Sequence, residues 1–294
     1  MPTFHYHYNR YFFAEQWTPE LNLDGFAQTR SHTEALGADC IVVHLASILA
    51  TNLAEQLFKL RQVAPARQVW VAEMLESAAH YPQLDDPDFM SLFDIEMSYR
   101  RTADIWTPYI PHNLESGYRD INPGTRRRQC CAFVSSKWDM SDRQNYMRDL
   151  MQQLDVHSFG RFMRNKRILF DRGVKTKLRL LKNYRYTLAF ENSLAPDYVT
   201  EKFYEPLLTG TIPIYLGAPN IEEFAPGDNC FINAHDFASP AELAEFVRHA
   251  DPAQFHLWRQ RDLRPGFVER LELLKQPWKT SLAQMITERL ELKH

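Results

Sequence analysis

The stretch "FENSLAPDYVTEK", residues 190–202, carries a dense set of side chains that could do chemistry. Two carboxylates, an amide, a phenol and an ammonium lie in it, and these are Glu191, Asn192, Tyr198, Glu201 and Lys202. An ammonium pairs with phosphate oxygens, and a carboxylate accepts hydrogen bonds from the hydroxyl groups of a sugar. The residue types therefore predict a binding site for a ligand that carries both phosphate and hydroxyl groups.

This cluster falls where a predicted strand is followed by a predicted helix. The sequence "YRYTLAFEN" predicts a strand that ends in polar groups, and Thr200 is placed to be the N-cap of the next helix. Ligands of open α/β sheets bind at the carboxyl ends of strands, and helix N-termini attract anions. The alternative is that Glu201 caps its own helix and Lys202 is solvated. Pro206 removes a helical hydrogen bond, so we expect a distorted or short first turn.

Strands and helices alternate through both halves of the chain. In the first half, the apolar runs 38–45 and 67–75 predict buried strands, and 53–63 predicts the helix between them. The second half repeats the alternation, with elements predicted at 130–136, 142–154, 155–160, 184–192, 198–208, 211–217 and 230–237. A strand–helix–strand order implies parallel sheets, so the prediction is an α/β protein with two doubly wound halves.

Two further segments bear on the domain organisation. The run "INPGTRRRQ" at 121–129 combines turn residues with basic residues and is the predicted linker. The tail 279–293 has apolar residues at helical spacing and predicts an amphipathic helix that packs across the domains, with a membrane-surface helix as the alternative. The arginines at 126–128 and the "SYRR" run at 98–101 could ring a cleft, although a charge run at a linker is more often solvated.

The composition is that of an ordinary soluble globular protein. The chain has 294 residues, 45% hydrophobic and 24% charged, with a formal net charge of −3. This length suggests one large or two medium domains, and the charge leaves no footprint for nucleic acid or for an anionic membrane. The motifs GxGxxG and GxxxxGK[ST] do not occur, which argues against dinucleotide oxidoreductases and P-loop enzymes.

The four cysteines predict buried thiols rather than disulfides or a zinc site. Cys130 and Cys131 are adjacent in a predicted buried strand, and no CxxC pair occurs. The first residues, "MPTFHYHYNRYFF", lack the basic-then-apolar order of a signal peptide. We therefore expect a cytoplasmic, reducing compartment.

The polar cluster and the motifs around it resemble a known family. The segments "AFENSLAPDYVTEK", "LLTGTIPIYLGAPNIEEFAP" and "FINAHDF" are similar to the donor-binding signature of the α1,3-fucosyltransferases, glycosyltransferase family 10. Upstream, "FVSSKWDMSDRQNYMRDLMQQLDVHSFGR", "MLESAAHYP" and "DIEMSYRRTADIWTPY" also resemble family segments, in the family's order. Together these motifs cover roughly residues 70–240, and they look like those of a bacterial-like soluble member.

This resemblance implies a GT-B fold, in which two Rossmann-like doubly wound domains face each other across a cleft and the C-terminal helix packs across them. The expected boundaries are 1–122 for an acceptor-binding domain, 123–275 for a GDP-fucose-binding domain and 276–294 for the C-terminal helix. The resemblance brings in no cofactor, since GDP-fucose is the donor substrate and no motif needs a divalent metal.

Motif positions also imply roles for single residues. Asn192, Tyr198, Glu201 and Lys202 match positions that contact the donor's phosphates, ribose and fucose, beside Glu191 at the end of the strand.

The second half contributes one more donor residue by this resemblance. Arg143 matches the family's arginine that faces the diphosphate. With Lys202, it is expected to offset the charge that develops on the GDP leaving group.

The first half is expected to supply the general base. The donor is β-linked and the product α-linked, so the family inverts through a single displacement that needs a base for the acceptor hydroxyl. Glu76 matches the carboxylate of the family's "MES" motif, and we expect poor solvation to raise its pKa towards working pH. Glu73, three residues earlier, is the competing candidate.

Some positions depart from the family pattern, and a few residues are candidate metal ligands; neither changes the predicted function. "SSK" stands where the family has "SN", Ala78 replaces a proline and Tyr81 a cysteine. Asp86-x-Asp88 resembles a carboxylate pair that holds Mn²⁺, but it lies in a proline-containing loop and is interpreted as solvated. His5 and His7 have strand spacing without an evident third ligand, so we expect acceptor contact or plain surface there.

The resemblance therefore implies an inverting fucosyltransferase that moves L-fucose from GDP-β-L-fucose to O3 of N-acetylglucosamine in N-acetyllactosamine-type glycans, in protein glycosylation of the Lewis-antigen type. The alternatives are a GT-B transferase with another nucleotide-sugar and a catalytically inactive glycan-binding relative. The expected partners are GDP-fucose and a glycan acceptor, without nucleic acid and with membrane contact at most peripheral to the inner face. A homodimer is left open.

Overall fold

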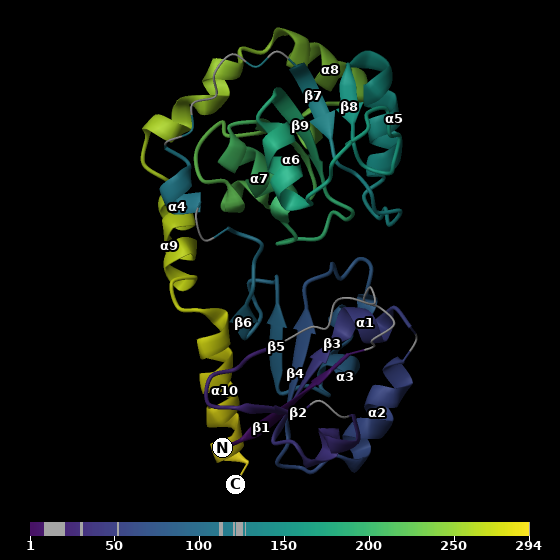
Figure 1. Ribbon diagram of the computed structural model, residues 1–294, viewed down its shortest axis with the longest axis vertical. Helices are drawn as coiled ribbons and strands as arrows, with labels where there is room; N and C mark the ends of the chain where they lie inside the picture. Colours follow the sequence, from purple (N-terminus) through teal and green to yellow (C-terminus); the bar gives the residue numbers. More distant parts are fainter. Residues whose placement is uncertain are drawn as a thin grey trace. The chain divides into compact units, whose positions relative to one another are not determined.

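The computed structural model describes residues 1–8, 21–29, 32–51, 53–111, 114–119, 121, 126 and 128–293. The chain divides into two compact units: Met1–Pro108 together with Leu274–His294, and Tyr109–Leu273. Each unit is built around one parallel sheet (Figure 1).

The first unit contains a six-stranded sheet in the order β2-β1-β3-β4-β5-β6. Its strands are β1 (Thr3–His7), β2 (Ala27–Thr29), β3 (Cys40–His44), β4 (Val69–Met74), β5 (Ile95–Ser98) and β6 (Ile105–Trp106). Its helices are α1 (Leu45–Leu49), α2 (Ala54–Val63), α3 (Pro87–Met90) and α10 (Trp278–Leu292), with 3-10 turns at His32–Gly37 and Pro82–Asp85. All recorded strand pairs are parallel, so the carboxyl ends of the strands share one edge.

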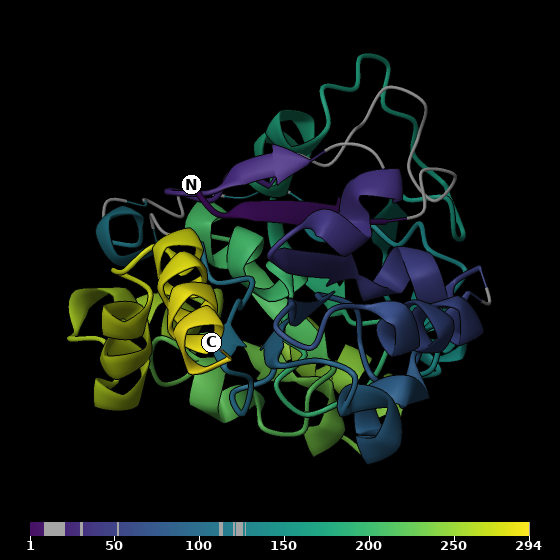
Figure 2. The ribbon, with the colours of Figure 1, turned by 90° about the horizontal axis from the view of Figure 1, so that it is seen from below.

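The C-terminal helix α10 belongs to the first unit. Its Leu282 and Ile286 are fully buried and join the core formed by Val42 and Val71 of the central strands. The helix lies beside this sheet in both views (Figures 1 and 2). The amphipathic pattern of the tail therefore serves the core of one unit. From the sequence we predicted instead a separate helix that packs across both domains.

The second unit contains a five-stranded sheet in the order β11-β10-β9-β7-β8. Its strands are β7 (Arg128–Ala132), β8 (Val156–Ser158), β9 (Tyr184–Phe190), β10 (Ile212–Leu216) and β11 (Ile232–Asn233). Its helices are α4 (Leu114–Gly117), α5 (Arg143–Gln153), α6 (Val174–Leu181), α7 (Glu201–Thr209), α8 (Pro240–His249) and α9 (Pro265–Leu273), with 3-10 turns at Ile221–Phe224, Ala234–Asp236 and Pro252–Gln260.

Residues after Pro108 already pack with the second unit, earlier than the expected boundary at 122/123, which itself lies outside the described residues. Tyr118 stacks on Trp258 with ring centroids 5.2 Å apart. Arg259 donates a hydrogen bond to the Tyr118 carbonyl at 2.9 Å. Hydrogen bonding and stacking therefore attach this connecting segment to the second unit.

The elements predicted from apolar periodicity occur close to their predicted positions. On α5, Met147 and Leu150 are buried, as is Leu154 just beyond the helix, whereas Tyr146 and Met151 are partly buried. All four cysteines are buried free thiols, as predicted. Among the described residues, no helix has the length and apolar character needed to cross a membrane.

Candidate active site

Glu191 is the centre of the polar cluster in the second unit. It follows β9 directly and its side chain is completely buried. The backbone N–H of Thr200 donates to Glu191 Oε1 at 2.8 Å, and the Thr200 hydroxyl lies 2.9 Å from both carboxylate oxygens. Lys202 Nζ lies 3.2 Å from Oε2. A carboxylate without solvent is therefore held by one threonine and one lysine.

The charges in this cluster depend on one another. Burial raises the pKa of Glu191, and Lys202 only partly opposes that effect. Burial also disfavours the charged form of Lys202, but Glu191 and Glu201 outweigh it and leave the pKa of Lys202 raised. For Glu201, burial is outweighed by Lys202 and Lys177, so its pKa is lowered. Lys202 and Glu201 therefore carry their charges at neutral pH.

Thr200 is the N-cap of α7, as the sequence predicts. Its hydroxyl accepts from the Lys202 backbone N–H at 3.4 Å, and Lys202 Nζ lies 2.9 Å from the same oxygen. The prediction for Pro206 was wrong. The helix continues from Glu201 to Thr209 and ends at Gly210 in a left-handed conformation. Pro206 is the sixth residue, so only the carbonyl of Lys202 loses its helical donor, and at the start of the helix the N–H groups of Lys202 and Phe203 are bonded to Thr200.

Lys177 of α6 is a member of the site that the sequence did not reveal. Its Nζ lies 2.6 Å from Glu205 Oε2 and 3.8 Å from Glu201 Oε1. It therefore joins α6 to two acidic residues of α7. The segment reads only as mixed and basic in sequence, and the sole available signal was a lysine on a short amphipathic helix directly before β9.

Gly217, just after β10, fits because it lacks a side chain. A Cβ atom there would lie 2.3 Å from the Tyr215 hydroxyl and 2.6 Å from Glu191 Cγ. Since no real Cβ makes contacts this short, the glycine lets the chain pass beside the buried carboxylate. The last residue of the "TIPIYLG" motif therefore helps to shape the cluster.

Asn192 and Tyr198 are buried beside this cluster. The Asn192 carbonyl accepts from the Met140 N–H at 2.8 Å. The buried Oδ1 of Asn192 has no hydrogen-bond partner among the residues that the structure covers. The Tyr198 ring meets Tyr109 edge to face, with centroids 6.3 Å apart. An open acceptor on a buried amide is suited to a ligand hydroxyl or N–H group.

Arg143 lies near the cluster, but its guanidinium is committed to the backbone. Nη1 donates to the Phe190 carbonyl at 3.0 Å, and Nη2 donates to the carbonyls of Ser136 at 3.2 Å and Trp138 at 3.1 Å. The side chain is almost fully buried, and burial lowers its pKa. Arg143 thus ties the carboxyl end of β9 to the loop after β7. The resemblance implied a more direct contact with a diphosphate.

The same loop lines a hollow of about 560 Å³ at the carboxyl end of β7. Its lining residues are Ser135, Ser136, Lys137, Trp138, Gln144, Arg161 and Phe162. Two aromatic rings, two cations and several hydroxyl or amide groups offer both stacking and hydrogen bonding. The volume lies within the range of small-molecule sites, roughly 300–1,000 Å³.

In the first unit, Glu73 and Glu76 lie at the carboxyl end of β4. Glu73 is the penultimate residue of the strand, and the Tyr6 hydroxyl of β1 donates a hydrogen bond to its carboxylate. Burial raises the pKa of Glu73 to about 7, although the hydrogen bond from Tyr6 opposes the rise. Glu76 is half-buried in the loop after the strand. Its charge raises the pKa of the nearby Tyr81, together with the larger effect of burial.

The candidate metal ligands have other partners. Asp86 caps α3 by accepting from the Asp88 N–H at 3.0 Å. His5 is buried with Nδ1 3.2 Å from the Thr29 hydroxyl, and its ring lies 5.9 Å from that of His7. Across the described ranges, no three His, Cys, Asp or Glu side chains are grouped to hold a metal ion.

The basic runs also have local structural roles. Arg126 is buried and donates to the carbonyls of Thr209 at 2.7 Å and Leu181 at 3.3 Å, so the interpretation as a solvated or cleft-ringing arginine was wrong. Arg127 lies outside the described residues. Arg100 donates to Asp85 at 2.5 Å and to the Leu84 carbonyl at 3.0 Å.

In the comparison with known proteins, a separate family model matches most of each unit. A family model described as glycosyltransferase family 10 (fucosyltransferase), C-terminal, matches residues 124–280, and one described as fucosyltransferase, N-terminal, matches residues 7–110. The human 4-galactosyl-N-acetylglucosaminide 3-alpha-L-fucosyltransferase FUT6 is 33% identical over 82% of this chain and 67% of its own length. Alpha-(1,3)-fucosyltransferase B of Drosophila melanogaster is 30% identical over 61% of this chain and 45% of its own. The chain thus spans about half to two thirds of the length of these relatives.

The fold agrees with these matches. A crystal structure of α1,3-fucosyltransferase with GDP-fucose has a TM-score of 0.59 to this chain at 16% identity, covering 94% of this chain and 90% of that one. A second, with GDP, has a TM-score of 0.56 at 15% identity. Likeness at this identity shows the fold, which is α/β with two parallel sheets of the GT-B type, as predicted. With family models matched in both units, the chain belongs to glycosyltransferase family 10, the fucosyltransferases.

Proposed function

We propose that the chain transfers L-fucose from GDP-β-L-fucose to a glycan hydroxyl, with inversion. The observation that carries this proposal is the cluster of Glu191, Thr200 and Lys202. It joins the carboxyl end of a central strand to the N-terminus of a helix in a family 10 chain. A helix N-terminus and an ammonium suit a diphosphate, whereas carboxylates suit sugar hydroxyls.

Within the second unit, Lys202 is the residue that stabilises the leaving diphosphate. Its ammonium is held by Glu191 and Glu201, so it is already positioned before the donor binds. A positioned charge stabilises the transition state without reorganising at the moment of reaction. Glu201, whose side chain is 42% exposed, is accessible to donor hydroxyls, and the buried amide of Asn192 offers one open acceptor.

The hollow beside Trp138 is the proposed site of the donor's nucleoside. It adjoins the loop that Arg143 fixes to the end of β9. Arg143 therefore acts as a positioning residue, which holds the wall of the nucleoside site in place. Lys202 is the residue that contacts the phosphates. This assignment gives Arg143 an indirect role in donor binding, and its test is a change in stability larger than the change in GDP affinity.

Glu76 is the proposed general base, and Glu73 is its rival. Family position supports Glu76, which lies half-buried just beyond the strand end. Local chemistry supports Glu73, because its pKa of about 7 suits a group that takes up a proton near neutral pH. Glu73, however, already accepts a hydrogen bond from Tyr6. We assign proton removal to Glu76 and a supporting role to Glu73.

The acceptor is proposed from the relatives. The human relative is named as a 3-fucosyltransferase acting on 4-galactosyl-N-acetylglucosaminide. On that basis we propose O3 of N-acetylglucosamine in an N-acetyllactosamine unit, which gives the α1,3 linkage of Lewis-type glycans. The reaction breaks the bond between fucose C1 and the β-phosphate oxygen and forms a bond from C1 to the acceptor oxygen, while the base takes the acceptor proton.

Turnover of radiolabelled GDP-fucose with N-acetyllactosamine tests this proposal. We expect labelled trisaccharide, with the fucose on O3 by NMR, and equal rates with EDTA and with Mn²⁺ because Lys202 supplies the cation. GDP should also raise the melting temperature, since a ligand that binds only the folded state stabilises it. Protection by UDP instead would favour another nucleotide-sugar. Protection by N-acetyllactosamine without any turnover or GDP effect would favour an inactive glycan-binding relative.

A further inference from the structure

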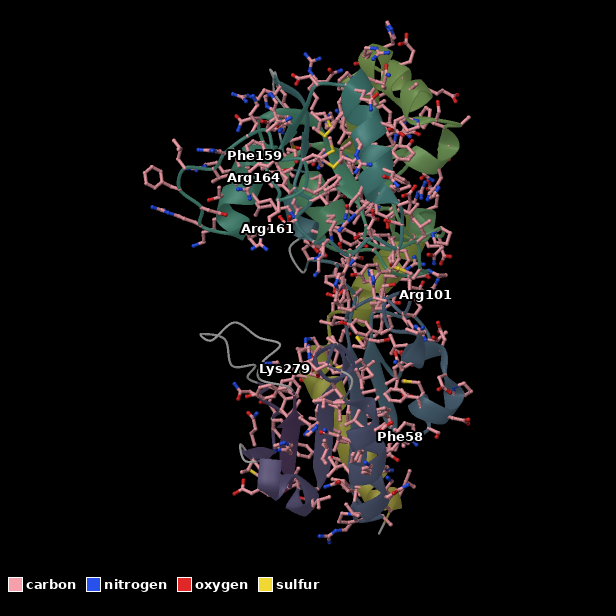
Figure 3. The ribbon with its side chains drawn as sticks, turned by 90° about the vertical axis from the view of Figure 1, so that its right-hand side faces the viewer. Phe58, Arg101, Phe159, Arg161, Arg164 and Lys279 are labelled. Atoms are coloured by element: carbon pink, nitrogen blue, oxygen red, sulfur yellow. The ribbon has the colours of Figure 1, made fainter. Side chains whose placement is uncertain are left out.

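Residues 164–179, named here the basic tip, lead from the loop after β8 into α6. Three apolar side chains of this segment face solvent: Leu169 is 87% exposed, Phe170 is 81% exposed and Val174 is 59% exposed. Arg164, at the start of the segment, is exposed and lies near Arg161 on one side of the second unit (Figure 3). Neighbouring apolar side chains left in water mark a surface that meets something apolar.

The same segment is strongly cationic. Seven of its residues are Lys or Arg and only Asp171 is acidic, which gives a formal charge of +6 in a chain whose total is −3. Six of the cations are exposed, namely Arg164, Lys166, Arg167, Arg172, Lys175 and Arg179. Within the described part of the chain, none of these six pairs with a carboxylate. The seventh, Lys177, is the one that pairs with α7.

The tip is held in a defined shape. The Asp171 carboxylate accepts from the Gly173 N–H at 2.8 Å, and the buried Thr176 hydroxyl accepts from the Arg172 N–H at 2.8 Å. A hollow of about 350 Å³ lies among Phe170, Arg172, Lys175, Thr176 and Arg179. Three cations thus converge on one concavity beside an exposed aromatic ring.

This surface is separate from the donor cluster. Lys175 and Arg179 are four residues apart and share one face of α6, whereas Lys177 between them lies on the opposite face. That opposite face meets α7 through Glu201 and Glu205. The exposed Lys175 and Arg179 therefore lie on the face of α6 opposite the one that meets α7.

We infer that the basic tip docks the protein on an anionic lipid surface. Phe170 and Leu169 enter the boundary between headgroups and acyl chains, the surrounding cations bind lipid phosphates, and one headgroup occupies the hollow. A soluble polyanion would satisfy the cations but would leave the two apolar side chains in water. Peripheral membrane binding requires both apolar insertion and electrostatic attraction, and the tip presents both within sixteen residues. This inference is independent of the proposed transferase activity.

Co-sedimentation of the full chain with vesicles tests the inference. Vesicles of phosphatidylcholine with roughly a third phosphatidylglycerol should bind the protein at low salt, because such cations each strengthen binding by roughly fivefold. Vesicles of phosphatidylcholine alone should bind little, and added salt should release the protein. The triple variant Arg164→Glu/Arg167→Glu/Arg172→Glu should bind at least a hundredfold more weakly.

Matched variants elsewhere control for total charge and apolar content. Lys59→Glu/Arg67→Glu/Arg261→Glu changes the net charge equally on other exposed positions and should bind like the wild type. Leu169→Ser/Phe170→Ser should weaken binding at least tenfold, whereas Leu273→Ser, a change at a residue 69% exposed, should not. Melting temperature and fucosyl transfer to a soluble acceptor verify that each variant is folded.

A probe at the tip separates insertion from surface attraction. Since all four native thiols are buried, Phe170→Cys introduces one accessible thiol for an environment-sensitive dye. Its emission should shift to the blue with anionic vesicles and stay constant with heparin. The inference would be overturned if the wild type did not bind vesicles, or if the control triple variant weakened binding equally. It would also be overturned, in favour of a soluble polyanion, if the dye responded to heparin but not to vesicles.

Discussion

The carboxyl edges of the two sheets hold their acidic residues in different ways. In the second unit, Glu191 is completely buried and is held by Thr200 and by Lys202 at 3.2 Å, and Lys202 opposes the rise in its pKa that burial causes. In the first unit, the deeply placed Glu73 is held by the neutral hydroxyl of Tyr6. Burial accordingly shifts the pKa of Glu73 to about 7.

This difference suits the two tasks that we propose. A site for a diphosphate needs a cation fixed in position, and the paired carboxylates of the second unit fix Lys202. A site that removes a proton needs a carboxyl group that is not stabilised as a permanent anion, and the first unit provides Glu73, whose pKa burial raises to about 7. The second edge therefore binds through a lysine paired with carboxylates, whereas the first edge offers a carboxyl group that can accept a proton.

The largest expected effect concerns the proton-accepting edge. Glu76→Gln should lower kcat for fucosyl transfer by on the order of a thousandfold while leaving the GDP dissociation constant within about twofold, because a positioned base contributes roughly a hundred- to ten-thousand-fold. Glu73→Gln is the matched variant, three residues away on the same strand end. We expect it to retain at least a tenth of the activity. If the losses were reversed, Glu73 would be the base.

A second effect concerns the arginine that supports the donor edge. Arg143→Met should destabilise folding by roughly 3 kcal/mol, because the carbonyls of Ser136, Trp138 and Phe190 lose their buried donor while the apolar volume is kept. Urea denaturation measures the change. GDP affinity of the folded fraction should fall less than tenfold. A stable variant that has lost GDP binding would instead show direct contact with the diphosphate.

A third effect concerns the positioned cation. Lys202→Met should reduce kcat/KM for GDP-fucose by about a hundredfold, since it removes one charge from the leaving diphosphate. Lys182→Met changes an exposed lysine at the end of α6 and should leave kcat/KM unchanged. Equal GDP affinity in Lys202→Met and the wild type, by calorimetry, would remove Lys202 from the donor site.

The sequence predicts an edge well when the residues that form it are close together in the chain, and the two edges differ in this respect. The donor edge is nearly continuous in sequence: Glu191, Thr200 and Lys202 lie within twelve residues, and the strand–turn–helix order around them is visible from apolar periodicity. The positions of Thr200 as N-cap and of the buried strand β9 were therefore predictable.

The remaining features depend on contacts between distant parts of the chain. Tyr6 meets Glu73 from 67 residues away, across an intervening strand, and no local pattern indicates it. Lys177 reaches α7 from a helix whose sequence reads only as basic. Arg143 was assigned to a phosphate by motif, but its partners are three backbone carbonyls that only the folded loop brings together. The partners of these residues are thus set by long-range hydrogen bonds and ion pairs, which apolar periodicity in the sequence does not predict.

The smallest expected effect is a pH dependence of stability that distinguishes the two edges. The folded pKa of Glu73, about 7, lies above its ordinary value of 4.5. Between these values the unfolded carboxyl ionises while the folded one keeps its proton, so this group's contribution to stability is present below pH 4.5 and is lost as the pH rises towards 7.

Glu73→Gln cannot titrate, so its free energy of unfolding relative to wild type should rise from pH 4.5 to pH 8 by on the order of 2 kcal/mol, measured in urea at both pH values. Tyr6→Phe should enlarge the wild-type loss, because the Tyr6 hydroxyl stabilises the ionised carboxylate and its removal raises the pKa further. A difference between Glu73→Gln and wild type that stays constant with pH would mean that Glu73 is ionised at neutral pH. The first edge would then hold an ionised carboxylate, as the second does in Glu201, and the contrast between them would be lost.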